Sequence, residues 1–212
     1  MSDSTRYTAA DHAARHTLAT RLVHAGLALA VVTQLVTSLV MHPAEDGKAG
    51  NLWFEVHEYG GLSAFALILL FWLVLTARKR GTPAGLLFPW LSGARLGALW
   101  SDIKHHAAAL RRMRLPEHDG ESPFASAVHG LGILLITAMA ASGTLYYIVG
   151  DGNPDAGGLV GVAMTVHKAL ANLAWAYLIG HAGMAVLQHL FTDFNLRRMW
   201  SFHTAPNKET LK

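Results

Sequence analysis

Four long apolar stretches constrain the fold of this chain more than any other feature of its sequence. They run over Leu22–Met41, Phe54–Ala77, Phe124–Val149 and Gly161–Leu190. Each reaches the roughly 20 residues that a helix needs to cross a bilayer. All seven prolines fall outside these stretches, as uninterrupted helices require. We therefore expect an all-α fold, an integral membrane four-helix bundle.

Composition agrees with a membrane domain. Only 15% of the residues are charged, whereas a soluble domain carries about 25%. We expect one domain over residues 22–199, with an N-terminal tail (1–21) and a C-terminal tail (200–212). The first stretch is too long for the apolar part of a signal peptide, so we expect it to be retained. The absence of cysteine excludes covalent c-type haem, iron–sulfur clusters and disulfides.

The distribution of positive charge predicts the topology. Fifteen of the seventeen Lys and Arg residues lie before the first stretch, between the second and third, or after the fourth. Lys48 alone lies in a loop on the opposite side, and Lys168 is within a stretch. Because positive loops stay in the cytoplasm, we expect a bacterial inner-membrane protein with both termini cytoplasmic. The surplus of positive charge is then a feature of topology, and we expect no nucleic-acid partner.

The loop between the second and third stretches is expected to contain an interfacial helix. Apolar residues recur there at helical spacing, with basic residues around them: Leu96, Leu99, Trp100, Ile103, Ala107 and Leu110. Such an amphipathic helix lies among the lipid headgroups. The outer loops carry acidic residues: Glu45, Asp46, Asp151 and Asp155. These carboxylates could dock a basic redox partner, or the outer loops simply lack positive charge.

Histidines inside the apolar stretches carry the functional signal. Of thirteen in the chain, those within or at the ends of the stretches include His24, His57, His129, His167 and His181, with His189 near the inner end of the fourth. Ionisable residues at membrane depth are costly and indicate function by default. The alternative for any single one is a hydrogen bond between helices.

The spacing of two histidines on the fourth stretch favours a pair of binding sites. His167 and His181 are 14 residues apart, which places them within about 40° of one helix face and about 21 Å apart along the axis. From the predicted direction of each helix, His57 lies at the depth of His167, and His24 at the depth of His181. We therefore expect an outer pair, His57 with His167, and an inner pair, His24 with His181.

Paired imidazoles at these depths fit two haem b groups. Two histidine ligands leave iron without an open position, which favours electron transfer. Small residues next to the ligands allow close approach of a flat ring, or simply tight helix packing: Ala25, Gly26, Gly60, Gly61, Gly180 and Gly183. Arg21 and Lys168 are candidate partners for haem propionates. They could equally reach toward lipid headgroups.

Three motifs resemble the bacterial cytochrome b561 family, which includes the b-type cytochrome subunits of nickel–iron hydrogenases. The first two are R-L-V-H-A at 21–25 and H-E-Y-G-G at 57–61. The third is an H-x13-H spacing whose second histidine lies in G-H-A-G-M-A-V-L-Q-H-L-F. The segment D-F-N-L-R-R-M comes after it and ends at 199. The resemblance implies a four-helix bundle with two b haems ligated by His24, His57, His167 and His181. It also implies electron exchange with quinone, often for a periplasmic dehydrogenase.

Two features depart from the compact members of that family. The loop between the second and third spans is long, as in the hydrogenase-type subunits. His129 resembles a third-span histidine of those subunits and is not expected to bind iron. With His189 it could line a quinone pocket on the cytoplasmic side, or it could hydrogen-bond to another helix.

The leading hypothesis is a di-haem cytochrome that carries electrons between a periplasmic dehydrogenase or cytochrome c and membrane quinone. An alternative from the same family is a stand-alone superoxide:quinone oxidoreductase, which would need no partner subunit. Whether the chain is itself an enzyme is left open. A metal or proton transporter is a third reading, disfavoured because transporters gather their ligands near the midplane.

Overall fold

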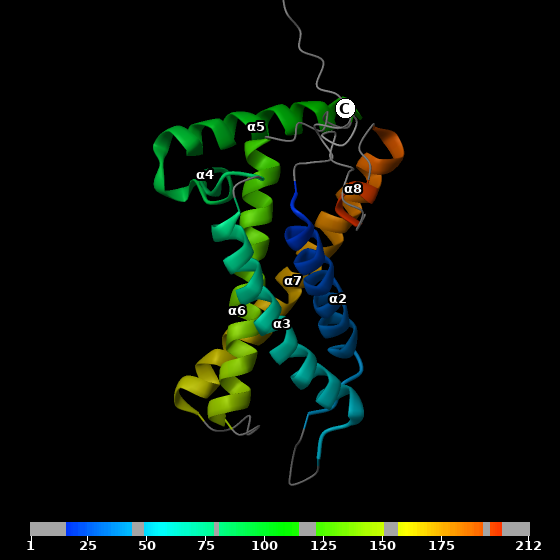
Figure 1. Cartoon of the computed structure of the whole chain (residues 1–212), viewed down its shortest axis with the longest axis vertical. Helices are drawn as coiled ribbons and strands as arrows, with labels where there is room; N and C mark the ends of the chain where they lie inside the picture. Colours follow the sequence, from blue (N-terminus) through cyan, green and yellow to red (C-terminus); the bar gives the residue numbers. More distant parts are fainter. Residues whose placement is uncertain are drawn as a thin grey trace, which may run out of the picture.

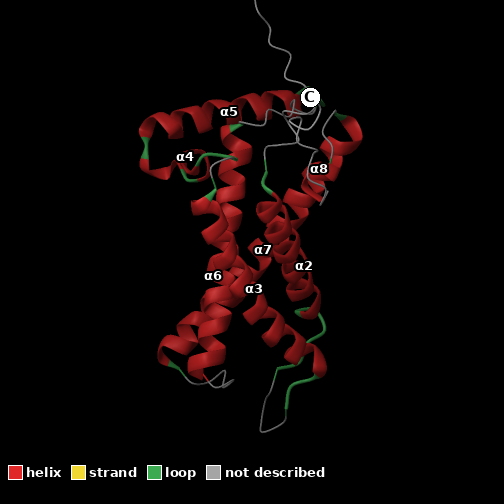
Figure 2. Ribbon diagram, viewed as in Figure 1, coloured by secondary structure: helices red, strands yellow, loops and turns green. Residues whose placement is uncertain are grey.

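Helices account for all the regular structure in the part of the chain that this computed structural model describes (Figure 2). The described residues are 16–43, 49–78, 81–114, 122–150, 157–192 and 196–200. The helices are α2 (Leu18–Thr37), α3 (Leu52–Ala77), α4 (Ala84–Leu87), the 3-10 helix η1 (Pro89–Leu91), α5 (Gly93–Arg111), α6 (Pro123–Gly150), α7 (Gly158–Phe191) and α8 (Arg197–Trp200). The predicted acidic residues of the outer loops and most of both tails lie outside the described residues.

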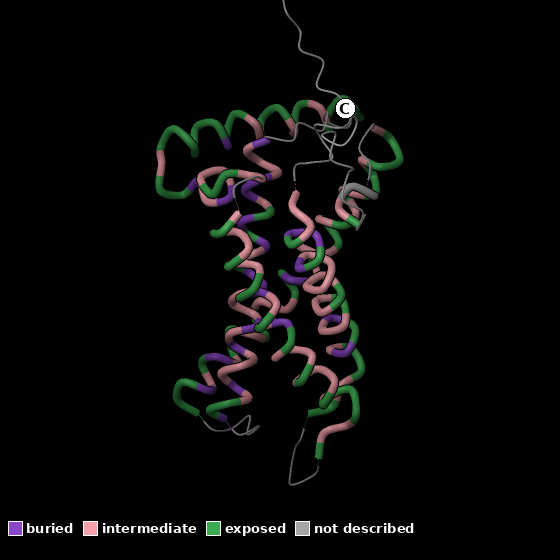
Figure 3. The backbone as a smooth tube through the Cα atoms, in the orientation of Figure 1, coloured by how far each residue is buried: buried purple, intermediate pink, exposed green. Residues whose placement is uncertain are grey.

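Four of these helices, α2, α3, α6 and α7, are long and apolar enough to cross a membrane. Exposed residues recur along all four of these helices (Figure 3). Exposed large apolar side chains among them include Leu29, Leu69, Leu73, Ile148, Leu173 and Ile179. Contiguous exposed apolar surface of this extent is unfavourable in water and is favourable against lipid chains. The predicted all-α membrane bundle is confirmed.

Polar residues define where several of the long helices begin. The hydroxyl of Thr17 accepts a hydrogen bond from the Thr20 amide at 3.2 Å, and α2 begins at Leu18. The Asn51 side chain accepts one from the Phe54 amide at 3.0 Å, and α3 begins at Leu52. The same Asn51 oxygen accepts from the His42 amide, so one side chain joins the two ends of the loop between α2 and α3.

The long helices run alternately up and down the bundle (Figure 1). The start of α2, the end of α7 and the helix α5 lie at one end, which we call the inner end; the opposite end is the outer end. The distribution of Lys and Arg predicts that these segments share one end; that this end faces the cytoplasm stays a prediction. Helix α2 packs along α3, α3 along α6, and α6 along α7, whereas α7 makes few contacts with α2.

Helix α5 lies across the inner end of the bundle (Figure 1), as its amphipathic pattern predicts. It is tied to the start of α6 by Asp102, whose carboxylate accepts hydrogen bonds from the Ser122 hydroxyl at 2.6 Å and the Phe124 amide at 2.9 Å. His106 contacts the same carboxylate at 3.1 Å. A carboxylate at a helix N-terminus satisfies free amides and favours the helix dipole. The carboxylate thus holds the interfacial helix to the bundle.

Apolar packing fills the bundle between its two ends. Leu35 of α2, Leu135 of α6 and Ala174 of α7 form one buried cluster. Ile68 of α3 packs with Ile136 and Ala140 of α6 in a second cluster. Ala174 is midway in sequence between His167 and His181. The first cluster therefore separates an outer histidine site from an inner one.

Candidate functional site

Two histidines meet at the outer end of the bundle. His57 is in the second turn of α3, and His167 is on α7. Their ring centroids are 6.3 Å apart and the ring planes cross at 83°. These are the two residues that the sequence predicts as the outer pair.

A second pair of histidines meets at the inner end. The rings of His24 on α2 and His181 on α7 have centroids 6.4 Å apart, with planes at 59°. In each pair a histidine of α7 meets a histidine of another helix, α3 at the outer end and α2 at the inner end, and the two separations are nearly the same.

This separation fits a metal ion held between two imidazoles. A transition-metal ion lies about 2 Å from an imidazole nitrogen, and the ring centre lies about 1 Å further, so two rings on opposite sides of one ion have centroids about 6 Å apart. Among the described residues, no group of three or more His, Asp or Glu side chains surrounds a common point. The donor set is therefore two imidazoles per site, which suits an ion whose remaining ligands come from a macrocycle.

The glycines near the four histidines divide into two kinds. At Gly60 and Gly61, an added Cβ would lie 2.5 Å and 3.3 Å from the Gln34 side chain, so these glycines serve close packing of α2 on α3. At Gly180 and Gly183 of α7, an added Cβ would meet no protein atom within 4 Å. The protein surface beside His181 is therefore open enough for a flat group.

Hydroxyl groups contact the outer imidazoles. The Thr37 hydroxyl is 3.0 Å from Nδ1 of His57. The Ser142 hydroxyl is 3.1 Å from Nδ1 of His167, and the Met139 carbonyl is 2.9 Å from the same nitrogen. In each ring the other nitrogen, Nε2, stays available as a ligand. Sequence reasoning missed Thr37 and Ser142, because isolated hydroxyls in apolar helices usually bond to their own backbone.

Aromatic rings surround the inner imidazoles. Tyr177 stacks on His181, and His129 meets the same ring edge to face at 5.2 Å. Trp200 of α8 lies edge to face with His24 at 6.1 Å. Nδ1 of His24 is buried without a hydrogen-bond partner. Sequence reasoning missed Tyr177, although its position four residues before His181 puts both on one helix face.

The sequence model of the prokaryotic cytochrome b561 family matches residues 15–202. The chain belongs to this family. No curated protein matches the chain, and no solved structure matches it. Membership in the cytochrome b561 family, together with four helices able to cross a membrane, makes the chain a multi-pass membrane b-type cytochrome. It binds haem b and takes part in electron transfer. The resemblance read from the sequence motifs is confirmed.

The other predicted site residues of this cytochrome b561 differ in how far their side chains are exposed. Arg21, one turn before His24, is buried, while Lys168, beside His167, is exposed. His129 and His189 are both exposed on the surface of the bundle. His129 is in ring contact with His181, one of the paired imidazoles.

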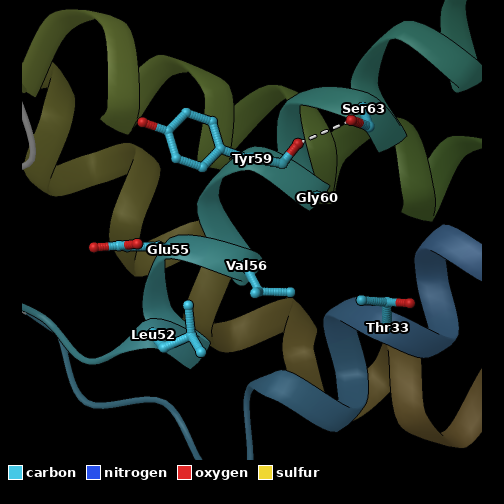
Figure 4. Close-up of a pocket in the computed structure, with 7 residues that line it drawn as sticks. All are labelled: Thr33, Leu52, Glu55, Val56, Tyr59, Gly60 and Ser63. Carbon is cyan, nitrogen blue, oxygen red and sulfur yellow. Dashed lines mark hydrogen bonds between the residues drawn. The ribbon is translucent and has the colours of Figure 1, made fainter.

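Two grooves lie near the ends of the bundle. One of about 450 Å³ runs along α3 at the outer end and is lined by Thr33, Leu52, Glu55, Val56, Tyr59, Gly60 and Ser63 (Figure 4). The other, of about 530 Å³, is at the inner end and is lined by Met113, Arg114, Leu187, Phe191 and Thr192. Neither groove includes a paired histidine, and the inner one includes neither His129 nor His189.

Proposed function

We propose that this cytochrome b561 binds two haem b groups and carries electrons across the membrane between a donor on the outer side and quinone in the bilayer. The observation that carries the proposal is the presence of two histidine pairs, with centroids 6.3 and 6.4 Å apart, at opposite ends of the bundle. One site would suffice for a haem protein. Two sites at different depths provide a path from one membrane surface to the other.

In this proposal each residue has a defined role. His57 and His167 hold the outer haem, and His24 and His181 hold the inner one. Arg21 and Lys168 neutralise haem propionates near the two membrane surfaces. The bound iron supplies one-electron oxidation and reduction, and bis-histidine ligation leaves it no open position for oxygen. The helices keep the two sites apart and exclude water between them.

We further propose that quinone approaches at the inner end, beside His129. The imidazole of His129 is in ring contact with the proposed inner ligand His181, and its side chain is exposed. A quinone next to His129 would be close to the inner haem and would have a polar group available for its oxygen. His189 lies two turns beyond His181, nearer the end of α7, and is the second candidate for a polar contact with quinone.

Haem stoichiometry in single-site variants tests the proposal. The purified chain should contain two b-type haems. His181→Ala should remove the inner haem and leave the outer one, and His167→Ala should do the reverse. His105→Ala, at an exposed position on α5, is the control and should keep both. A wild-type chain with one haem, or a His181→Ala variant with two, would contradict the assignment.

The donor is tested by isolating the chain in mild detergent from its native membrane. A dehydrogenase subunit or cytochrome c that stays bound would identify a protein donor. Reduction of the haems by superoxide alone, with no partner bound, would favour the stand-alone oxidoreductase instead.

A further inference from the structure

The two histidine pairs have different hydrogen-bonded surroundings. At the outer pair, both rings have polar contacts at Nδ1. At the inner pair, Nδ1 of His24 is buried without a hydrogen-bond partner. The His181 ring is in contact with the rings of His24, His129 and Tyr177. The two sites are therefore alike in spacing and unlike in what acts on their ligands.

The polar contacts of the outer pair follow the same pattern on two helices. On α2, the Thr37 hydroxyl donates to its own helix, at the carbonyls of Thr33 (2.8 Å) and Gln34 (3.0 Å). On α6, the Ser142 hydroxyl likewise donates to Ala138 (2.7 Å) and Met139 (3.0 Å). In both cases the same hydroxyl oxygen lies beside Nδ1 of a ligand histidine.

This pattern fixes the tautomer of each outer ring. A hydroxyl has one hydrogen to donate, and in both residues a backbone carbonyl takes it. The hydroxyl oxygen can then only accept, so Nδ1 must carry the hydrogen. At His167 the Met139 carbonyl, 2.9 Å from Nδ1, supports the same assignment. Nε2 of each ring is left with a lone pair that points away from these contacts.

Hydrogen bonds donated from Nδ1 also change the ligand electronically. They make the imidazole a stronger donor to the metal, which stabilises the oxidised form of iron relative to the reduced form. The outer rings have such bonds on both sides of their site. The inner ring of His24 has none.

We propose that Thr37 and Ser142 are positioning residues that hold His57 and His167 as Nδ1–H tautomers and give the outer haem the lower reduction potential. This inference rests on the proposed di-haem function and adds the direction of electron flow. An electron shared between the sites then resides mainly at the inner end: the outer iron is oxidised, the inner iron is reduced, and no proton or ligand is exchanged. Electrons therefore run from the outer surface toward α5.

The test is a redox titration of the purified chain with Thr37→Val, Ser142→Ala and the double variant. His181→Ala is expected to retain only the outer haem, so its titration identifies which of the two wild-type transitions belongs to the outer haem. Each single variant should raise the ratio of reduced to oxidised outer haem at a fixed potential by about threefold to tenfold. Tenfold corresponds to about 59 mV for a one-electron couple. The inner potential should not move.

Matched controls separate this effect from a general disturbance of the helices. Thr33→Val and Ser63→Ala remove hydroxyls that bond to the backbone of α2 and α3, at 3.0 and 2.9 Å, and should leave both potentials unchanged. Thr37→Ser keeps the hydroxyl and should keep the wild-type potential. If Thr37→Val loses the outer haem, Thr37→Ser should still retain it. Loss of the outer haem in Thr37→Ser as well would count against the inference.

The outcomes distinguish the inference from the proposed function. A wild-type chain without two bis-histidine haems, by haem assay and low-spin electron paramagnetic resonance, would overturn the proposed function. Two such haems with an outer potential that is the higher of the two, or that is unmoved in the double variant, would overturn the inference alone.

Discussion

The rings of Tyr177 and His181 are stacked, with centroids 5.4 Å apart and planes 7° from parallel. Four residues separate them on α7, so the helix itself brings the two rings together. Tyr177 also packs against Gly132 of α6, where an added Cβ would overlap the phenol ring. His181 is therefore oriented by packing, whereas His57 and His167 are oriented by hydrogen bonds.

Gly132→Ala should displace the Tyr177 ring and weaken the inner site. A rigid aromatic ring cannot yield to a methyl group without moving, and overpacking of this kind costs about 1–3 kcal/mol. The expected result is fewer than two haems per chain, with the outer haem retained. Gly161→Ala on α7, where an added Cβ meets nothing within 4 Å, is the control. Full retention of an inner haem with unchanged spectrum and potential would show that Tyr177 does not orient His181.

Trp200→Ala should lower the reduction potential of the inner haem. The Trp200 ring lies at the edge of His24, and its removal admits water to the inner site. Water stabilises the more highly charged oxidised centre, since burial is one of the levers that set haem potentials. A redox titration measures the shift, and the outer potential should stay constant. Trp100→Ala, at an exposed tryptophan of α5, should change neither potential.

His129→Leu should slow electron exchange with quinone while both haems are kept. The substitution removes the polar imidazole next to His181 and puts an apolar side chain at the same exposed position. Stopped-flow oxidation of the reduced protein by a soluble quinone analogue measures the rate, and a haem assay checks the content. A variant with wild-type quinone kinetics would move the quinone site elsewhere on the bundle.

Asp102→Asn should destabilise the attachment of α5 to α6 at neutral pH. Burial of Asp102 by itself raises its pKa, but hydrogen bonds from Ser122 and Phe124 and the proximity of His106 outweigh that effect, so the folded pKa lies below the usual 3.8. A depressed carboxyl pKa stabilises the fold above 3.8, and that contribution is lost as the pH falls through the folded value. Replacement of the charge should cost about 1 kcal/mol.

The pH dependence of this difference is the diagnostic measurement. The thermal midpoint of Asp102→Asn should lie below that of the wild type at neutral pH, and the gap should close as the pH falls below 3.8. Ser101→Ala, at the exposed neighbouring position, should match the wild type throughout. A gap that stays constant over this range would mean that the carboxylate charge does not stabilise the fold.

The two histidine pairs could be predicted from sequence because they follow from helix geometry. A separation of 14 residues places His167 and His181 on one face whatever surrounds them, and the direction of each helix follows from the charges in the loops. The roles of Thr37 and Ser142 depend instead on how α2 and α6 are rotated about their axes. The position of Trp200 depends on a short helix after α7. Neither rotation nor the placement of a short helix is contained in a hydropathy pattern.

The small residues beside the ligands show the same limit. Gly60 and Gly180 are hard to tell apart from sequence, since each lies within three residues of a predicted ligand. Only the structure separates them: the Gln34 side chain occupies the space at Gly60, while the space at Gly180 is open. The difference arises because α2 packs closely on α3 and sparsely on α7.

The cluster of Leu35, Leu135 and Ala174 gives the bundle an insulating layer across its middle. These three side chains have no atom that can hold or relay a proton. In the proposed function, each electron that passes between the outer and inner sites moves charge across part of the membrane and does work with or against the membrane potential. For an electron crossing the full bilayer, this amounts to about 2.3 kcal/mol per 100 mV. The membrane potential should therefore shift the distribution of electrons between the two proposed sites.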